Sequence, residues 1–387
     1  MTIPMREEII FLSETGSQRA EQAIMTYEIM HGEKLVASIT LQGECEIYEA
    51  RFMPCNLYLE QTDELDRRVD NVTNFYYWCA TRVLSLDRKY AKEILNSLGM
   101  GQAVTDRERA RIALSYHCLT LTDLYWVREA GENISFAGIN LYENHLSNAF
   151  VDVALRGRQM TVQNAHLLAG DTSTNGCFPK AWIRETDGFY LLKDGDPEAV
   201  ERELLASRIC RCFRCRQVQY EPFVYEGITV SKSRLMTSQR YGIISREAFE
   251  IYAANQEIDV MQYILKLDPY TFYMMNILDY LVGNTDRHWG NWGFLFDNET
   301  GEILRLHDLM DFNQAFSAYD SVDGAGCQTI PDGKLTQREA ALYAVRQIGL
   351  NQLGEVDDKW FGESTDRLEM FRRRLAILYS KTVIQHI

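Results

Sequence analysis

The sequence lacks the features that mark secreted, membrane-spanning and fibrous proteins. No run approaches the roughly 18 apolar residues that a membrane-spanning helix needs. The first residues, Met-Thr-Ile-Pro-Met-Arg-Glu-Glu, have no charged-then-apolar signal pattern. Proline is scarce, with only 7 in 387 residues, and no internal repeat or low-complexity linker interrupts the chain. These absences predict a cytoplasmic globular protein.

Basic residues are too few to balance the acidic ones. The chain carries 40 Lys and Arg against 55 Asp and Glu, a formal net charge of −15. Such a surface repels nucleic acid and anionic lipid unless a local basic patch overrides it, so neither is expected as a broad partner. A protein of this charge that holds a nucleotide must concentrate basic side chains or metal at one site.

Cysteine usage argues against a disulfide framework. Nine Cys is an odd number, and they are scattered from Cys45 to Cys327, which fits reduced thiols. The spacing of Cys210, Cys212 and Cys215 offers three thiolates to zinc, but no second pair and no nearby His completes a tetrahedral set. We interpret these three as small hydrophobic residues at the end of a helix.

The chain, at 387 residues, is long enough for two or three lobes. Alternating apolar and polar residues predict strands in the first 60 residues, at 35–41 and 45–52. Residues 61–130 turn helical, with Thr105 as a capping residue; the predicted helices are 63–84, 90–98 and 106–121. No chemistry is recognisable in this third, which suits a structural or partner-binding domain.

The rest of the chain alternates turn-rich and helical segments. A hairpin about Thr-Asp-Gly is predicted near residue 186, a helix opened by Pro197 follows it, and helices dominate from about residue 239. The clearest elements are strands 181–184 and 189–193 and helices 197–213, 269–282 and 366–381.

Asp286 and Asn291 are the strongest candidates for chemistry. The helix predicted at 269–282 leads directly into Asn-Thr-Asp-Arg-His-Trp-Gly-Asn, in which Asp286 precedes Asn291 by five positions. The same separation joins the catalytic Asp and the metal-binding Asn of the kinase signature H-R-D-L-x-x-x-N. Taken singly, Asp286 and Asn291 are each explained more simply as polar residues of a turn than as functional residues. Together with the elements that follow, they indicate a phosphoryl-transfer site.

The segment after Asn291 predicts a hairpin that returns the chain to its starting point. Strands at 292–296 and 302–307 bring Asp311, in Met-Asp-Phe-Asn, back beside Asn291. An amide and a carboxylate oxygen can then share Mg²⁺, which leaves Asp286 for the acceptor hydroxyl. Asp308 is the alternative to Asp311 as the metal ligand. Asp308 continues the predicted strand, however, and a side chain that simply faces solvent is the other interpretation.

Arg287 and His288 invite a metal or acid–base role. The nearest other His, His307, closes no recognisable ligand set. We therefore expect both side chains to brace the loop by hydrogen bonds to the backbone or to Asp286.

Lys193 is the candidate for contacting ATP phosphates. It ends the apolar strand Phe-Tyr-Leu-Leu, where an ammonium is costly unless it meets an anion or water. In kinases such a Lys is oriented by a Glu on the following helix. We expect Glu203 in that role, with Glu201 as the next choice. An exposed Lys at a strand end is the simple alternative.

A loop of exposed backbone N–H groups is the remaining requirement for holding phosphates. The segment 171–176 offers the candidate residues Thr172, Ser173, Thr174, Asn175 and Gly176. It is neither G-x-x-x-x-G-K-S/T nor G-x-G-x-x-G, and a run of this composition is more often a plain loop.

These motifs resemble those of the HipA-like kinases, Ser/Thr protein kinases with an atypical bilobal kinase fold. The specific part of the resemblance is D-R-H-x-x-N at 286–291 with Met-Asp-Phe-Asn-Gln at 310–314. Upstream, 173–180 resembles their phosphate loop, 190–193 their ATP-lysine strand, and 202–209 the helix after it. The resemblance covers about residues 158–387.

The resemblance implies an α+β, bilobal kinase-like fold with an additional mixed N-terminal domain. We expect this domain at 1–155, a small lobe at 156–238 and a mainly helical large lobe at 239–387. The implied cofactors are ATP and Mg²⁺, or Mn²⁺ in its place. The implied catalytic and metal residues are Asp286, Asn291 and Asp311, and the implied ATP contacts are Lys193, Glu203, Thr172, Ser173, Thr174, Asn175, Gly176 and Lys180.

The resemblance also implies transfer to a protein hydroxyl and autophosphorylation of the phosphate loop. Ser173, Thr172 or Thr174 is the expected site, and phosphate there would make it self-regulating, because a dianion in the loop would repel the ATP phosphates. The family includes toxins with cognate antitoxins, so an antitoxin or regulatory partner is a candidate. The charge of −15 gives no support for a DNA-facing surface, and the first domain shows no sign of the family's short N-terminal domain.

Two other functions stay open at this point. Phosphoinositide kinases share D-R-H-x-x-N and a later D-F-G, but the acidic charge, the lack of a basic membrane-facing run and the short chain disfavour a lipid substrate. The second alternative is a pseudokinase scaffold that binds a nucleotide but does not transfer its phosphate. The presence of every candidate catalytic residue disfavours it.

Overall fold

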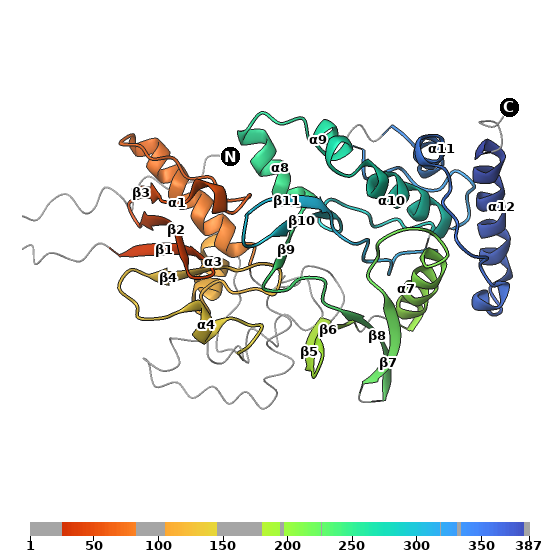
Figure 1. The fold of residues 1–387 in the computed structure, drawn as a ribbon, viewed down its shortest axis with the longest axis horizontal. Helices are drawn as coiled ribbons and strands as arrows, with labels where there is room; N and C mark the ends of the chain where they lie inside the picture. Colours follow the sequence, from red (N-terminus) through yellow and green to blue (C-terminus); the bar gives the residue numbers. More distant parts are fainter. Residues whose placement is uncertain are drawn as a thin grey trace, which may run out of the picture.

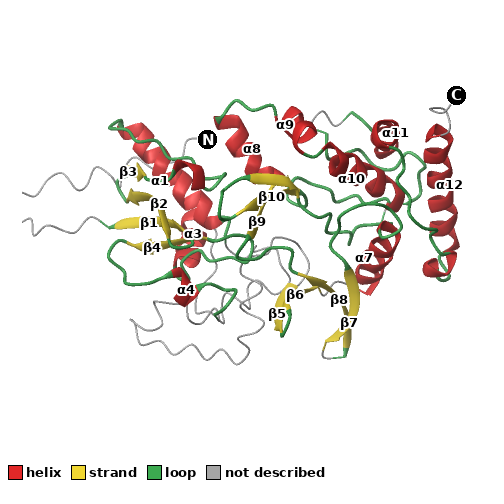
Figure 2. Cartoon of the chain, in the orientation of Figure 1, coloured by secondary structure: helices red, strands yellow, loops and turns green. Residues whose placement is uncertain are grey.

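The computed structural model describes residues 25–82, 105–144, 180–193, 197–225, 227–317, 319–330 and 334–382. These residues form three antiparallel sheets and two hydrophobic cores, strung along one long axis (Figure 1 and Figure 2). The N-terminal elements lie at one end of the molecule, and helix α12 (Thr365–Thr382) lies at the other.

The first sheet organises the N-terminal region. Its strand order is β3-β2-β1-β4, and helices pack with it around a core that includes Phe75, Trp78, Tyr116 and Trp126. The elements are β1 (Thr26–His31), β2 (Lys34–Thr40), β3 (Cys45–Ile47), the 3-10 helix η2 (Ala50–Phe52), α1 (Leu65–Ala80), α3 (Asp106–Leu114), β4 (Tyr125–Glu129) and α4 (Phe136–Ile139).

Helix α3 begins where the sequence predicts but ends earlier. Thr105 closes a capping box with Glu108, accepting from the Glu108 N–H at 3.2 Å and donating its own N–H to the Glu108 carboxylate at 2.9 Å. The predicted continuation to Leu121 is wrong, because His117 and Cys118 have positive φ angles of 58° and 55°, which leave the helix.

Other boundaries in this region also differ from the prediction. Helix α1 is shorter than 63–84, and the strand predicted at 45–52 ends at Ile47, where η2 takes over. The helix predicted at 90–98 lies outside the described residues.

The second sheet has the order β5-β6-β8-β7, with helix α7 packed on β7 and β8. The predicted hairpin is confirmed: β5 and β6 pair in antiparallel register from Lys180 with Lys193 to Glu185 with Gly188. Strands β7 and β8 were not predicted. The elements are β5 (Lys180–Glu185), β6 (Gly188–Lys193), α7 (Pro197–Cys210), β7 (Tyr220–Tyr225) and β8 (Ile228–Arg234).

The third sheet has the order β11-β10-β9 and is covered by helices. The hairpin predicted after Asn291 is confirmed as β10 and β11, while β9 is an unpredicted third strand that pairs with β10. The elements are β9 (Tyr241–Ser245), α8 (Arg246–Asn255), α9 (Val260–Leu267), α10 (Pro269–Val282), β10 (Gly293–Asp297), β11 (Ile303–Leu306), α11 (Gln337–Ile348), the 3-10 helix η4 (Asp358–Phe361) and α12.

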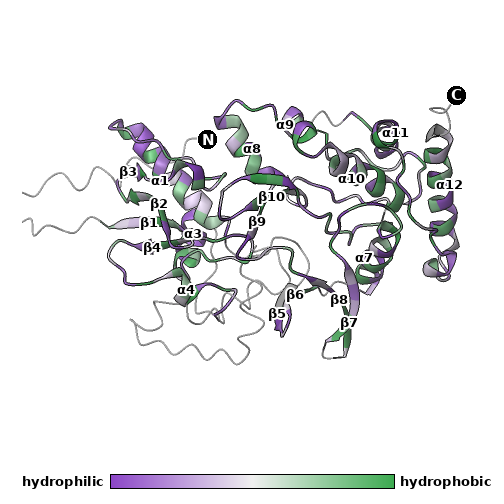
Figure 3. Cartoon of the chain, in the orientation of Figure 1, coloured by the Kyte–Doolittle hydropathy of each residue, from purple (hydrophilic) through white to green (hydrophobic). Residues whose placement is uncertain are grey.

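Helix α10 forms the centre of the second core and has the predicted bounds. Of its 14 residues, 11 are buried, so it is apolar on nearly all sides (Figure 3). The Asp268 side chain caps it by accepting from the Thr271 N–H, and Gly283 ends it with a φ of 60°. A Cβ at Gly283 would collide with the Tyr319 ring, so glycine is required at the position where the helix ends and the chain continues into residues 284–291.

The N-terminal region is fixed to the strands of the other two sheets. The Ile243 N–H in β9 donates to the Thr122 carbonyl at 2.9 Å, and the His31 imidazole bonds the Asn298 side chain at 3.1 Å. Phe189 and Leu191 of β6 pack on the N-terminal core. The two cores are therefore joined by both hydrogen bonds and apolar contacts.

The predicted α+β class is confirmed by this mixture of helices and antiparallel sheets. The domain boundary near residue 155 lies outside the described residues, and the one at 238 falls in the loop between β8 and β9, so the division stays a prediction. No helix in the described part of the chain has both the length and the apolar character to cross a membrane.

Buried His307 gives stability a defined pH dependence. Burial lowers the pKa of His307 from 6.5 to about 4. Between these values the unfolded chain binds a proton that the folded chain excludes, so stability falls as pH drops from about 6.5 to 4, by roughly 3 kcal/mol. Urea unfolding of wild type and His307→Asn across this range should show a shallower slope for the variant. Equal slopes would contradict the assignment.

Candidate functional site

Lys193 lies between two carboxylates from distant parts of the chain. Its ammonium is 2.8 Å from Glu203 Oε1 on α7 and 3.0 Å from Asp311 Oδ1 in the loop after β11. Burial by itself lowers the pKa of an ammonium, but the carboxylates of Asp311 and Glu203 outweigh it and raise the pKa of Lys193 well above its ordinary value. The Lys therefore stays charged inside the protein.

Helix α7 presents Glu203 because that side chain points inward. Glu203 is only 1% exposed, and the Ser231 hydroxyl in β8 donates to its second oxygen. A buried carboxylate is costly without such partners. Glu201, the second choice from sequence, points outward: its side chain is 66% exposed and lies 3.9 Å from Arg367. The structure thus brings Lys193 to Glu203 and away from Glu201.

Tyr220 is a member of this centre that the sequence did not reveal. Its hydroxyl accepts a hydrogen bond from the Asp311 N–H at 3.0 Å, and its ring lies 5.0 Å from the Lys193 ammonium. The Tyr220 N–H donates in turn to Ser207 of α7 at 3.2 Å. Asp311 has a φ of 60°, a conformation that a non-glycine residue keeps only when its surroundings hold it. Tyr220 therefore ties α7 to the Asp311 backbone.

The loop of residues 284–291 is held by a fully buried arginine. Arg287 makes a two-pronged ion pair with Asp279 of α10, at 2.9 and 3.0 Å, and donates to the carbonyls of Asn291 and Met310 at 3.0 and 2.6 Å. Arg287 thereby links the loop that carries Asn291 to Met310, the residue before Asp311. This agrees with the prediction that the hairpin after Asn291 returns Asp311 to its side. A charged Asp279 inside an apolar helix is a sequence signal that indicates a buried cation.

Asp286 and Asn291 are in direct contact. The Asn291 amide donates to the Asp286 carbonyl at 2.8 Å and lies 3.4 Å from its carboxylate. His288 braces the same loop, as expected from sequence: its Nδ1 accepts from the Gly290 N–H at 3.0 Å, and its Nε2 is 3.8 Å from Asp286. The Asp286 side chain is 40% exposed, so the loop presents this carboxylate at the surface.

Asp311 and Asp308 occupy different environments. Asp311 lines a cavity of about 460 Å³ together with Lys193, Tyr220 and Asn291. Asp308 does not line it and is paired with Arg305 at 2.8 Å instead. The geometry therefore favours Asp311 over Asp308 as a group that meets a ligand in the cavity. The volume lies within the range of small-molecule sites.

The remaining candidate residues are not brought to this centre by the described structure. Thr172, Ser173, Thr174, Asn175 and Gly176 lie outside the described residues, as does the side chain of Lys180. Across the described ranges, no group of three or more His, Cys, Asp or Glu side chains is arranged to hold a metal.

The three closely spaced cysteines do not converge on one point. The Cys212 thiol donates to the Glu355 carbonyl at 3.4 Å, whereas the Cys215 thiol donates to the Cys210 carbonyl at 3.4 Å. Burial raises the pKa of Cys210 well above its ordinary value and that of Cys215 to about 12, which keeps both as thiols. They are side chains packed at the end of α7.

The fold is similar to that of solved kinase-type structures. HipA of Shewanella oneidensis MR-1, solved with HipB and its operator DNA, matches with a TM-score of 0.54 at 11% identity over 92% of this chain and 99% of that one. The chain has a HipA-like fold. The Helicobacter pylori proinflammatory kinase CtkA also matches, with a TM-score of 0.44 at 14% identity over 55% of this chain and 94% of that one. No protein-family model and no curated protein sequence matches.

The HipA-like fold extends beyond the region in which the sequence motifs resemble HipA-like kinases. Those motifs lie within residues 158–387, whereas the match to HipA covers 92% of the chain. Most of the N-terminal region therefore belongs to the common fold, although its sequence gave no sign of this.

The hydrogen bond from the Asp311 N–H to Tyr220 can be measured by mutation. Tyr220→Phe leaves a buried N–H without its acceptor, so the free energy of unfolding should fall by about 1–3 kcal/mol. Tyr263→Phe is the matched control, because within the described residues the Tyr263 hydroxyl makes no hydrogen bond. Equal unfolding free energies for the two variants in urea would show that this bond contributes nothing.

Proposed function

We propose that the protein is an ATP- and Mg²⁺-dependent Ser/Thr protein kinase of the HipA-like type. The observation that carries the proposal is the buried Lys193, held between Glu203 and Asp311 in one cavity with Asn291. Lys with a helical Glu, together with an Asp and an Asn, is the set that phosphoryl transfer uses in kinases. The HipA-like fold supports the same conclusion.

Lys193 is suited to bind the ATP phosphates. Its charge is maintained by the carboxylates of Asp311 and Glu203 despite burial, and its position in the cavity is fixed by Glu203, which is only 1% exposed. An ammonium that is already oriented needs no reorganisation when a polyanion arrives. Glu203 acts through Lys193 and does not itself touch the nucleotide.

Asn291 and Asp311 suit Mg²⁺. Both line the cavity and offer one amide and one carboxylate oxygen, the hard donors that this ion prefers. Mg²⁺ is commonly held by one or two protein carboxylates, with phosphates and waters as the other ligands. Two protein ligands, Asn291 and Asp311, are therefore enough to bind it. When bound, the ion would neutralise charge on the transferring phosphate. Mn²⁺ has the same ligand preference.

Asp286 is the group proposed to accept the proton of the acceptor hydroxyl. Its carboxylate is presented at the loop surface, and the Asn291 amide lies 3.4 Å from it. In this proposal Asn291, which lines the cavity, binds the cation, and Asp286, which contacts Asn291, accepts the proton.

A regulatory partner is part of the proposal. The HipA structure contains HipB and operator DNA. A partner protein of that kind is proposed for this chain, because the fold it would recognise is shared. Broad DNA contact by this chain itself is disfavoured, because its net charge is −15.

Transfer of the γ-phosphate from labelled ATP tests the proposal. With lysate proteins as acceptors, Asp286→Ala and Asp311→Ala should each lower transfer by about 10²–10⁴-fold. Asp308→Ala is the matched control, since Asp308 lies three residues from Asp311 but pairs with Arg305 outside the cavity, and it should retain transfer. Phosphoinositide vesicles form a parallel arm. Labelling of the vesicles alone, or equal activity in all variants, would contradict the proposal.

Autophosphorylation of the phosphate loop has its own test. Mass spectrometry of the wild-type protein should find phosphate on Ser173, Thr172 or Thr174, and Asp286→Ala protein should lack it, because the transfer needs the catalytic carboxylate. An active wild-type protein without phosphate on residues 171–176 would exclude this self-modification.

A further inference from the structure

The N-terminal region forms part of the cavity that contains Lys193 and Asp311. The cavity is lined by residues of the small and large lobes and also by residues between 54 and 125, which the sequence left without chemistry. We call the latter residues the N-terminal wall: Pro54, Cys55, Asn56, Tyr77, Trp78, Ala80, Thr81, Arg82, Arg109, Thr120, Thr122, Asp123 and Tyr125.

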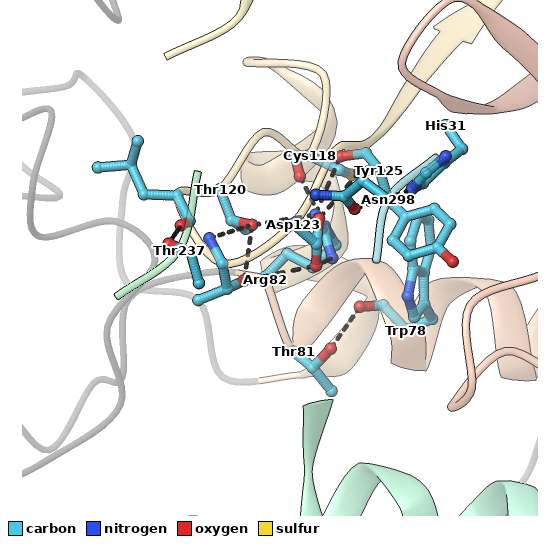
Figure 4. A network of polar contacts seen from close by, with 12 residues as sticks. His31, Trp78, Thr81, Arg82, Cys118, Thr120, Asp123, Tyr125, Thr237 and Asn298 are labelled. Atoms are coloured by element: carbon cyan, nitrogen blue, oxygen red, sulfur yellow. Dashed lines mark hydrogen bonds and ion pairs between the residues drawn. The ribbon is translucent and has the colours of Figure 1, made fainter. Parts of the chain in front are cut away.

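A buried ion pair fixes the N-terminal wall in shape. Arg82 donates to both carboxylate oxygens of Asp123, at 3.0 and 2.6 Å, and to the carbonyl of Cys118 at 2.6 Å (Figure 4). The side chains of Arg82 and Asp123 are only 7% and 11% exposed. The Asp123 carboxylate also accepts from the Tyr125 N–H at 2.9 Å. The wall is therefore preformed, so a ligand would not have to order it.

The N-terminal wall is also attached to the segment that joins the two lobes. The Thr237 hydroxyl after β8, which Figure 4 labels near the ion pair, donates to the Leu121 carbonyl, and the Ile243 N–H in β9 donates to the Thr122 carbonyl. The wall thus keeps its position relative to the reacting centre.

Different segments bring different chemistry to the cavity. The lobes supply Lys193 and Asp311 together with apolar side chains, including Leu191, Val218 and Met310, which suit the flat base of a nucleotide. Helix α1 of the wall and helix α8 line the same cavity with Tyr77 and Glu247, and the loop residue Gly290 also lines it. The Glu247 N–H donates to the Trp289 carbonyl at 3.1 Å, so α8 begins directly against the loop that carries Asp286.

Polar groups of the N-terminal wall and of α8 are available to bind a ligand. Within the described residues, the Glu247 carboxylate, the Asn56 amide and the Tyr77 hydroxyl make no hydrogen bond or ion pair, although all three side chains line the cavity. Tyr77 is 42% exposed. Exposed aromatic residues beside polar groups are typical of surfaces that bind a polypeptide.

Resting on the proposed kinase function, we propose that the N-terminal wall and α8 bind the acceptor, an extended segment of a protein. The segment passes between Tyr77 and Glu247 and delivers its Ser or Thr hydroxyl to Asp286. Glu247 selects a basic residue in it, because an unpaired carboxylate beside the reacting loop attracts a cation and the chain's net charge of −15 steers cationic partners toward it.

A peptide library separates this role from a purely structural one. The probe is a positional library of Ser- and Thr-centred peptides with labelled ATP, used with the full-length protein. Tyr77→Ala should raise the KM for peptides about 10-fold, while the nucleotide dissociation constant stays within about twofold. Tyr58→Ala is the matched control: Tyr58 belongs to the same region and is 41% exposed but lies outside the cavity lining, so its KM should stay unchanged.

Charge reversal at position 247 tests the selection of a basic residue. Wild type should prefer peptides with Arg or Lys near the acceptor, and Glu247→Lys should shift that preference by about 10-fold toward Asp or Glu. An unchanged preference, or equal KM values for Tyr77→Ala and Tyr58→Ala, overturns the acceptor role of the wall and leaves the kinase proposal standing. Wild-type transfer to phosphoinositide vesicles but to no peptide or protein overturns both the acceptor role and the protein-kinase proposal, as does absence of transfer to any acceptor.

Discussion

A single ammonium group, buried between two carboxylates, is the constraint on which the arrangement of the lobes depends. Lys193 ends strand β6, and Glu203 lies on the following helix, α7. Asp311 follows β11 and lies 118 positions after Lys193 in the chain. Removing Lys193 would leave two carboxylates buried without a cation, which typically costs several kcal/mol. The sheet, the helix and the loop must therefore form together. The bond from the Asp311 N–H to Tyr220 and the pairing of Arg287 with Asp279 extend the same constraint to the loop of residues 284–291.

A second buried ion pair gives the N-terminal region a comparable role. Arg82 and Asp123 are 41 positions apart, and their pairing shapes the turn that bonds to Thr237 and Ile243. The N-terminal region therefore helps to line the cavity that contains Lys193. This fits a HipA-like fold that covers nearly the whole chain. It also explains why residues from all three parts of the chain line one cavity.

The sequence predicted the elements whose signals are local. The bounds of α10 follow from apolar spacing, a proline at its start and a glycine at its end, and both hairpins follow from strand–turn–strand patterns. Lys193 and Glu203 could be paired because a kinase-type pattern places a Lys before a helical Glu. The sequence could not predict β9, since Tyr-Gly-Ile-Ile-Ser becomes a strand only by pairing with β10, about 50 residues away. The early end of α3 depends on two positive φ angles, and Tyr220 and the wall depend on long-range contacts, which no local pattern encodes.

We expect the Lys193 centre to hold the phosphates of a nucleotide together with a divalent cation. A crystal structure with Mg²⁺ and a non-hydrolysable ATP analogue would test this. Phosphate oxygens should lie within hydrogen-bond distance of the Lys193 ammonium, and side-chain oxygens of Asn291 and Asp311 should bind the cation. Phosphates elsewhere on the protein, or a cation bound without either residue, would rule out this role.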